Sequence, residues 1–357
     1  MNRTSEYLHG GYVYGTHVKY DFSANLNPLG MPESVRKAAR DAADRSDRYP
    51  DPFCGEFTAR LSGQLKVGGD RIVIGNGADD LIYRIVYALK PKRAVIVTPT
   101  FTEYAAALEN AGCEITEHRL SEENAFLLDD TVLDKLTDGA DMLFLCSPNN
   151  PTGRLADPYL LERIVKACER GIYLVLDECF IELAENGASH SLNAEELNSY
   201  TIILRAFTKT YAMPGLRLGY AVFGSKDTAV SVRLAGQHWS VSVPAQAAGI
   251  AALGEREYTE NARKLIAQER EYLSAGFRVL GFKVYPSDAN FILCSADSAE
   301  KVLHLENGLR AEGIAIRNCW NFSGLGERYF RIAVRPHSEN EALISAAERC
   351  VESWQRS

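Results

Sequence analysis

Six short apolar runs between residues 71 and 223 alternate with longer segments, and this alternation constrains the fold more than any other feature. Each run is about as long as a strand and rich in branched apolar side chains, which predicts strands covered on both faces rather than half-exposed antiparallel ones. Helical spacing lies between the first five runs, so the sequence predicts a parallel α/β sheet with helices on both faces. The runs are 71–75, 94–98, 142–146, 173–178, 201–205 and 218–223.

The pattern changes after about residue 236. A long charged amphipathic segment (258–280) is followed by shorter strand-like runs, a helical segment near 298–312 and a closing helix, which together predict a smaller α+β unit. We therefore expect a large domain over 41–236, and a second unit built from the N-terminal arm (1–40) and residues 237–357. No Pro/Gly/Ser-rich linker separates the two, so they are expected to pack rigidly around a cleft.

Composition excludes several classes of function. The chain has 357 residues, 46% of them hydrophobic, which is enough for a substantial core and excludes disorder as the main state. Its 39 basic and 47 acidic side chains give 39 − 47 = −8, which argues against binding nucleic acid or an anionic membrane. No apolar stretch is long enough to span a bilayer and the N-terminus has no apolar signal core, so a cytoplasmic location is expected.

Cysteine usage indicates neither a metal site nor a redox motif. The eight cysteines include no C-x-x-C pair, and most of them lie inside apolar runs such as M-L-F-L-C. They are expected to be small buried hydrophobic residues in a reducing compartment.

Polar motifs follow several of the predicted strands. Lys209, in T-K-T, lies between two runs, where open α/β folds bind ligands. Asp177 ends an apolar run, where a buried carboxylate needs a donor or cation. In G-N-G-A-D, a strand passes through Gly77 into a helix whose first amides, at Ala78 and Asp79, suit a phosphate. The motif lacks the G-x-G-x-x-G spacing, which argues against a dinucleotide site.

The loop S-P-N-N-P-T-G, residues 147–153, directly follows the run at 142–146. Its prolines and glycine predict a tight loop that leaves the amides of Asn149 and Asn150 available as ligand donors. Each of these motifs alone also fits an ordinary surface lysine, turn or helix start, whereas together they describe a pyridoxal phosphate site.

The combination S-P-N-N-P-T-G, D-E, T-K and G-L-R-x-G resembles the fold-type I pyridoxal-phosphate enzymes of the class I/II aminotransferase superfamily over nearly the whole chain. The resemblance implies a large, mostly parallel sheet of the seven-stranded type. It also implies that pyridoxal 5'-phosphate is joined to Lys209, pairs through its ring nitrogen with Asp177, stacks on Tyr104, and receives a hydrogen bond from Asn149 or, by the usual register, Asn150. The cofactor phosphate is implied to bind at Gly77, Ala78, Asp79, Thr208 and Arg217. Tyr49, in R-Y-P-D-P, matches a tyrosine that reaches the neighbouring subunit's site, which implies a homodimer with shared active sites.

Two families within the superfamily share this spacing: histidinol-phosphate aminotransferases and L-threonine-O-3-phosphate decarboxylases, the latter serving cobalamin biosynthesis. The opening H-G-G and D-F-S-A-N-L-N-P-L-G resembles the decarboxylases almost residue for residue. Phe180 stands where the aminotransferase usually has a tyrosine, and the tail R-Y-F-R-I-A-V-R carries the second late arginine typical of the decarboxylase. These features favour the decarboxylase family.

By that resemblance Arg331 binds the substrate α-carboxylate, Arg317 and Arg335 are candidate ligands of the substrate phosphate, and His9, Asn27 and Tyr49 close over that end. Guanidinium groups suit both anions. The expected reaction converts L-threonine O-3-phosphate to (R)-1-aminopropan-2-yl phosphate and CO2, without a metal. Three alternatives stay open: the same reaction on L-serine O-phosphate giving ethanolamine phosphate, a 2-oxoglutarate-dependent histidinol-phosphate aminotransferase, and a cofactor-binding module without catalysis.

Overall fold

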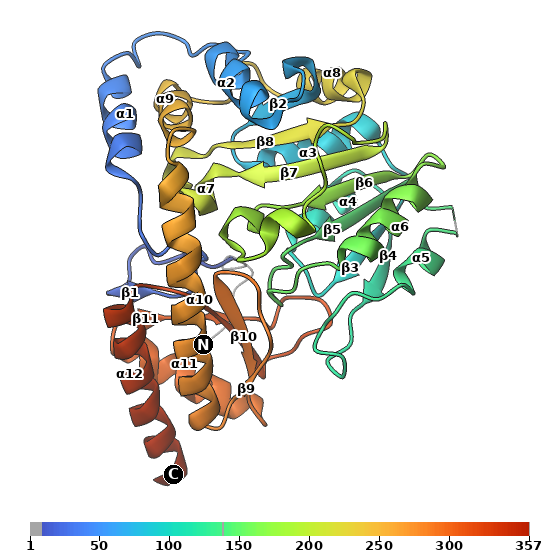
Figure 1. The fold of residues 1–357 in the computed structure, drawn as a ribbon. Helices are drawn as coiled ribbons and strands as arrows, with labels where there is room; N and C mark the ends of the chain where they lie inside the picture. Colours follow the sequence, from blue (N-terminus) through green and yellow to red (C-terminus); the bar gives the residue numbers. More distant parts are fainter. Residues whose placement is uncertain (1–8, 138, 357) are drawn as a thin grey trace.

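The computed structural model describes residues 9–137 and 139–356 and forms two α/β units stacked one above the other (Figure 1). The long helix α10 (Arg256–Val279) runs from the upper, larger unit into the lower, smaller one (Figure 1). The large unit is built on a seven-stranded sheet and the small unit on a four-stranded sheet.

The large sheet has the strand order β2-β8-β7-β6-β5-β3-β4. The four neighbouring pairs from β7 to β4 are parallel, which confirms the predicted mostly parallel sheet. Its strands are β2 (Ile72–Gly75), β3 (Arg93–Thr98), β4 (Glu114–Arg119), β5 (Met142–Cys146), β6 (Tyr173–Asp177), β7 (Thr201–Ala206) and β8 (Gly219–Phe223).

Two features of this sheet differ from the sequence prediction. β8 runs antiparallel to both β7 and β2, because the chain between β7 and β8 holds only the one-turn helix α7 (Phe207–Thr210) and a 3-10 turn (Pro214–Leu216). A parallel crossover usually contains a full helix, which residues 207–218 do not form. The edge strand β4, E-I-T-E-H-R, has no apolar run. Among its residues only His118 is buried, as expected for a strand at the edge of the sheet.

The strands of the sheet are apolar throughout because helices cover both faces. In β5, Met142 and Phe144 join one core cluster, whereas Leu143 and Leu145 join the other, as expected from the alternation of side chains along a strand. The large unit's helices are α2 (Gly55–Leu65), α3 (Ala78–Leu89), α4 (Glu103–Asn110), α5 (Val132–Lys135), α6 (Pro158–Cys168) and α8 (Lys226–Leu234), with 3-10 turns at Gly69–Arg71, Ile181–Leu183 and Gly187–His190.

The small unit has an antiparallel sheet of order β12-β13-β10-β9, and a two-stranded parallel sheet in which β1 of the N-terminal arm pairs with β11. The arm therefore becomes part of the small unit. Its elements are β1 (Tyr20–Asp21), β9 (Lys283–Val284), β10 (Phe291–Ser295), α11 (Ala299–Ala311), β11 (Ile314–Ala315), β12 (Arg317–Asn318), β13 (Tyr329–Ala333) and α12 (His337–Arg356).

Helices α1 (Glu33–Ala43) and α9 (Val243–Ala252) lie beside each other at the large unit. Val35 of α1 and Ala248 of α9 share a core cluster with Ile72 and Val222 of the large sheet. The small unit's own core, around Phe277 and the sheet residues next to it, begins further along α10. Helices α1 and α9 therefore both pack against the large sheet.

A cluster around Glu122 joins the two units at their outer edge. Glu122 follows β4 of the large sheet and accepts hydrogen bonds from Tyr285, Arg328, Lys283 (2.9 Å) and the Tyr329 hydroxyl (2.7 Å) of the small unit. Burial would raise the pKa of Glu122, but these donors and the charge of Arg328 outweigh it and hold that pKa at about 2. The ionised carboxylate therefore acts as a bridge between the units.

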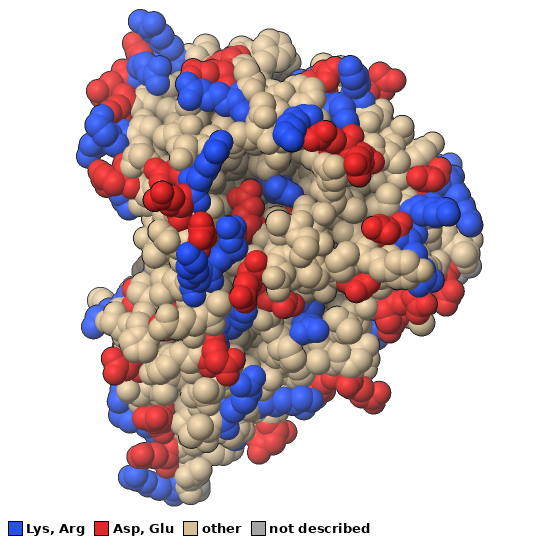
Figure 2. Space-filling view, viewed as in Figure 1, with Lys and Arg blue, Asp and Glu red and all other residues tan. Residues whose placement is uncertain are grey.

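Four features of the described residues bear on the functions that the sequence argues against: the cysteines, the surface charges, the helices and the metal-ligating side chains. All eight cysteines are free and buried, which confirms that they are hydrophobic core residues. Basic and acidic side chains are interspersed on the face seen in Figure 2. Within the described ranges, no helix combines the length and apolarity that crossing a bilayer requires, and no group of three or more His, Cys, Asp or Glu side chains could hold a metal ion.

Candidate active site

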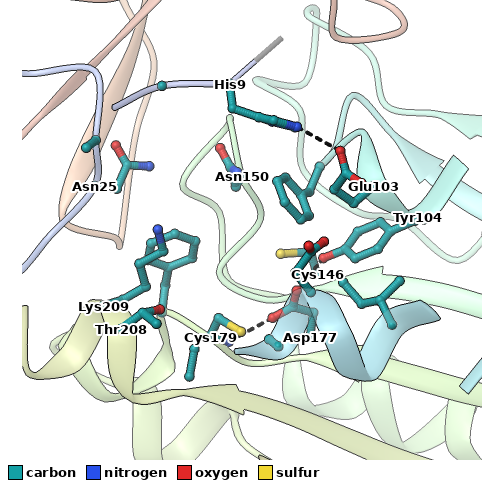
Figure 3. Close-up of a pocket in the computed structure, with 18 of the residues that line it drawn as sticks. His9, Asn25, Glu103, Tyr104, Cys146, Asn150, Asp177, Cys179, Thr208 and Lys209 are labelled. Carbon is teal, nitrogen blue, oxygen red and sulfur yellow. Dashed lines mark hydrogen bonds and ion pairs between the residues drawn. The ribbon is translucent and has the colours of Figure 1, made fainter. Parts of the chain in front are cut away.

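A cavity of about 420 Å³ lies between the two units, beside the carboxyl ends of β5, β6 and β7 (Figure 3). Parallel strands place their carboxyl ends at one edge of a sheet, so side chains far apart in the sequence meet there. Eleven of the residues singled out in the sequence line this cavity. They are His9, Ala78, Asp79, Tyr104, Asn150, Asp177, Thr208, Lys209, Arg217, Arg317 and Arg331.

Asp177 ends β6 with both carboxylate oxygens engaged. Oδ2 accepts a hydrogen bond from the Tyr104 hydroxyl (2.5 Å), and Oδ1 accepts one from the backbone N–H of Cys179 (2.9 Å). The Tyr104 ring is fully buried and stacks on Phe144, with ring centroids 4.9 Å apart. Burial and the charge of Asp177 hold the pKa of Tyr104 well above its usual value, so its hydroxyl stays a donor.

Lys209 lies in the one-turn helix α7, directly after β7 (Figure 3). Burial, together with the charges of the nearby guanidinium groups of Arg331 and Arg217, lowers its pKa to about 8. The ammonium nitrogen is 5.9 Å from the centre of the Phe180 ring. This amine therefore loses its proton more readily than an exposed lysine and can act as a nucleophile or base.

The start of α3 forms an anion-binding corner of the cavity. Gly77 precedes the helix at φ +88°, and a Cβ at that position would lie 2.6 Å from Nη2 of Arg217. No side chain caps the helix, so the first-turn amides remain for a ligand, with Ala78 and Asp79 at the cavity wall. Burial raises the pKa of the Asp79 carboxyl, and the charge of nearby Glu103 raises it too.

Arg331 of β13 enters the cavity from the small unit. Its guanidinium donates to Oδ1 of Asn150 through Nη1 and to the backbone oxygen of Ser23 through Nη2 (2.7 Å). Burial lowers the pKa of Arg331 to about 10. Within the described part of the chain no carboxylate forms an ion pair with Arg331, and its Nε–H has no hydrogen-bond partner. A buried cation of this kind could hold an anionic ligand.

A second arginine lies directly beside it. Arg317 of β12 is the register partner of Arg331 across the antiparallel pair β12–β13. Arg317 is also buried, lies over the Phe322 ring, and donates to the backbone oxygen of Asn318 (2.9 Å). Two buried guanidinium groups on neighbouring strands repel each other, so an anion between them is stabilised by both.

His9, in the N-terminal arm, lies above the cavity mouth (Figure 3). Its Nε2 is 2.7 Å from Oε1 of Glu103, the first residue of α4. The His9 ring also contacts Phe101, with centroids 5.7 Å apart. The arm thus reaches across from the small unit to the large one.

Comparison with known proteins places this fold and site in a family. The model of the family Aminotransferase class I and II matches residues 18–349. The chain belongs to the class I and II aminotransferase family.

Among similar family members, the threonine-phosphate decarboxylase of Salmonella typhimurium is 39% identical over 330 residues, covering 91% of this chain and 89% of the relative. The crystal structure of L-threonine-O-3-phosphate decarboxylase from Porphyromonas gingivalis matches with a TM-score of 0.82 and 25% identity, over 93% of this chain and 99% of that one. Histidinol-phosphate aminotransferase from Sinorhizobium meliloti, solved in complex with pyridoxal-5'-phosphate, matches with a TM-score of 0.83 and 25% identity, over 93% and 90%. The backbone alone therefore does not separate the two activities.

Four residues that the resemblance assigned to the site, Gly77, Asn27, Arg335 and Tyr49, do not line the cavity of this aminotransferase-family chain. Gly77 directly precedes the lining residue Ala78. Asn27 is buried and donates to the backbone oxygen of Thr210 (2.8 Å), so it supports the Lys209 segment. Arg335 forms an ion pair with Glu339 (2.9 Å). Tyr49 is 81% exposed and contacts the Trp239 ring, with centroids 4.7 Å apart.

Other cavity residues were not singled out in the sequence. Asn25 lines the cavity two positions before Asn27, and its Oδ1 is buried without a hydrogen-bond partner. The other lining side chains include aromatic and polar groups that no chemical motif marks, because their role comes only from the fold. They are Ser23, Phe101, Glu103, Cys146, Cys179 and Phe322.

Proposed function

We propose that this chain is a pyridoxal-phosphate-dependent decarboxylase of L-threonine O-3-phosphate. The products are (R)-1-aminopropan-2-yl phosphate and CO2, which places the reaction in cobalamin biosynthesis. One observation carries the proposal: Arg331 and Arg317, buried side by side, face the same cavity as Lys209. Two arginines on one side of a reactive amine suit an amino acid with two anionic groups. The 39% identity to a threonine-phosphate decarboxylase supports the same reading.

The cavity residues fit pyridoxal phosphate. Lys209 supplies the amine that joins the cofactor, Asp177 a carboxylate for the ring nitrogen, and Asn150 an amide for the phenolic oxygen. The uncapped start of α3, with the side chains of Thr208 and Arg217, fits the phosphate. Phe101 and Tyr104 form an aromatic wall, edge to face at 5.7 Å. When bound, the cofactor draws electrons from the substrate α-carbon, so that a bond at this carbon can break.

The chain's own residues select which bond breaks. In the proposed complex Arg331 holds the α-carboxylate and Arg317 the phosphate, so the substrate is fixed at both ends. Whichever bond at the α-carbon stands perpendicular to the cofactor ring is cleaved, and decarboxylation requires the carboxylate there. The carboxylate leaves as CO2, and the α-carbon takes up one proton, for which the buried Lys209 ammonium is the nearest assigned donor. Phe180, which lies near Lys209, has no hydroxyl group, in contrast to the tyrosine that the aminotransferases usually have at this position.

L-Serine O-phosphate is the closest competing substrate, since it lacks a single methyl group. One methyl group in an apolar pocket discriminates by only about 1–3 kcal/mol. We therefore expect measurable release of CO2 from both phosphate esters, with the threonine ester preferred.

We propose that the enzyme is a homodimer whose sites are shared. Tyr49 projects from the surface together with Phe53 and Trp239, each about half exposed or more. Large aromatic groups that cluster on a surface favour burial against another protein. The occupant we propose is a second copy of the chain, with Tyr49 of each copy at the other's cavity. Light scattering should give twice the chain mass of 39.5 kDa.

The deciding experiment incubates the cofactor-loaded enzyme with phosphothreonine, phosphoserine and histidinol phosphate, and measures CO2 and keto-acid formation separately. We expect CO2 from phosphothreonine without any 2-oxoglutarate. Transamination of histidinol phosphate without release of CO2 would instead assign the chain to the aminotransferases. In Lys209→Ala both the absorbance band of the bound cofactor and turnover should disappear, whereas the exposed Lys226→Ala should keep both. An enzyme that keeps turnover without Lys209 would refute the assigned role.

A further inference from the structure

A carboxylate lines the cavity at a point where an anionic substrate is proposed to enter. Glu103 begins α4, and its side chain is 17% exposed. A negative charge beside a site for phosphate and carboxylate groups opposes their binding. The contacts of Glu103 resolve this conflict.

Both oxygens of Glu103 are engaged by donors. Oε1 lies 2.7 Å from Nε2 of His9, and Oε2 accepts a hydrogen bond from the Tyr83 hydroxyl (2.7 Å). The bond to His9 holds the pKa of Glu103 below its usual value, and the start of α4 favours a negative charge as well. Glu103 is thus an ionised acceptor, and each of its carboxylate oxygens is hydrogen-bonded to one of these two donors.

The backbone of the arm fixes His9 from the other side. Gly11 N–H donates to Oγ of Ser23 (2.8 Å), and at Gly10 a Cβ would lie 2.0 Å from the backbone oxygen of Ser23. The arm therefore lies directly on the segment that also accepts the hydrogen bond from Arg331. His9 is held at its backbone by Ser23 and at its ring by Glu103.

With Nε2 bound to Glu103, Nδ1 has no hydrogen-bond partner within residues 9–137 and 139–356 and is the ring nitrogen that can meet a ligand in the cavity. The charged groups that line this cavity include Asp79 of α3, Glu103 of α4, Arg217 and Arg331 of β13. The imidazole is therefore the group that can offer a donor to an anion at the mouth, since both oxygens of Glu103 are already engaged.

We propose that Glu103 is a positioning residue that acts through His9: it holds the imidazole over the cavity mouth so that His9 binds the substrate's phosphate group. This inference rests on the proposed function, because it requires a phosphorylated substrate. A carboxylate that fixes a histidine by one ring nitrogen and leaves the other for the ligand is a general way to orient an imidazole. Tyr83 supports the same arrangement by engaging the second oxygen of Glu103.

The test is a double-mutant cycle in the cofactor-loaded enzyme with phosphothreonine as substrate. Glu103→Gln should raise KM about tenfold and leave kcat within about twofold, since a charge-assisted hydrogen bond is lost away from the reacting atoms. His9→Ala should raise KM at least as much. In the His9→Ala background, the change at Glu103 should add less than about twofold, because its route of action has already been removed. Glu109→Gln, an exposed change on the same helix, is the matched control.

A second readout does not depend on turnover. Hydrogen exchange of the backbone around Gly10 and Gly11, measured without substrate, should be faster in Glu103→Gln than in the wild type and unchanged in Glu109→Gln. An unchanged KM, an equal rise in KM in both backgrounds, or unchanged exchange at the arm would each overturn the inference. If the wild type releases no CO2 from phosphothreonine, the proposed function fails instead, and the exchange measurement still tests whether Glu103 holds the arm.

Discussion

Arg331→Gln separates the part of Arg331 that serves binding from the part that serves folding. The wild-type guanidinium is buried, donates to Asn150 and to the backbone of Ser23, and has no ion pair with a carboxylate of the described residues. If this cation is held for a substrate anion, its removal should abolish efficient turnover and leave the free energy of unfolding nearly unchanged. If it is a structural group, its removal should destabilise the protein.

The magnitude follows from two opposing effects. Burial lowers the pKa of Arg331 from 12.5 to about 10, and at about 1.4 kcal/mol for each tenfold change in proton affinity the buried charge costs roughly 3 kcal/mol. Losing two hydrogen bonds from a charged donor costs roughly 1.5–3 kcal/mol each, of which the glutamine amide restores about one. These effects nearly cancel, so we expect the free energy of unfolding to change by less than about 1.5 kcal/mol.

For turnover, no favourable effect offsets the loss of the Arg331 guanidinium. Two charge-assisted hydrogen bonds to the substrate carboxylate are lost, which at about 4 kcal/mol corresponds to a fall of roughly 10³-fold in kcat/KM. The assays are urea unfolding of the cofactor-loaded enzyme without substrate, and steady-state release of CO2 from phosphothreonine. Arg349→Gln, which removes an exposed ion pair with Glu312, is the control. Destabilisation by more than about 3 kcal/mol, or kcat/KM within tenfold of the wild type, would refute the reasoning.

Three further predictions follow from contacts described above. Asp177→Asn should lower kcat by about 10²-fold or more while the bound cofactor's absorbance persists, since the amide no longer stabilises a protonated ring nitrogen; an unchanged kcat would contradict this role. Glu122→Gln should reduce the free energy of unfolding by about 1–2 kcal/mol at pH 7; because the folded-state pKa is lowered to about 2, the stabilisation is present above about pH 4.5, and urea unfolding should show the deficit shrinking as the pH falls toward 2. Arg317→Gln should raise KM for phosphothreonine far more than Arg335→Gln, because Arg335 lies outside the cavity and pairs with Glu339; equal effects on KM would show that the two arginines share the role.

The large sheet could be predicted because its strands obey a single rule. Runs buried on both faces are apolar at every position, and β5 was predicted to the residue, as M-L-F-L-C. The antiparallel direction of β8 was not predicted, since direction depends on whether the joining segment forms a crossover helix rather than on the strands themselves. The edge strand β4 was not predicted because only His118 of its residues is buried, so the strand carries no apolar run.

The cofactor side of the cavity could be predicted better than the substrate side for a similar reason. Lys209 and Asp177 follow strands of one parallel sheet, so their convergence follows from topology alone. The substrate side of the cavity combines the N-terminal arm with the small unit. Two asparagines of the arm lie only two positions apart, and one of them faces the cavity. Asn25 and Asn27 occupy similar positions in the sequence. Asn27 donates its side-chain amide to the backbone oxygen of Thr210, whereas Asn25 lines the cavity. Likewise no local pattern joins His9 to Glu103, 94 residues away.

The charge of the whole chain says little about this cavity. A net charge of −8 argues against polymeric anions, and three carboxylates line the cavity itself. Their surroundings differ: Asp177, which is assigned to the cofactor's ring nitrogen, accepts hydrogen bonds from Tyr104 and a backbone amide, Glu103 is engaged at both oxygens, and burial raises the pKa of Asp79. An acidic protein can therefore bind a doubly anionic metabolite, because the partners of its carboxylates, rather than their number, set the potential that the ligand meets.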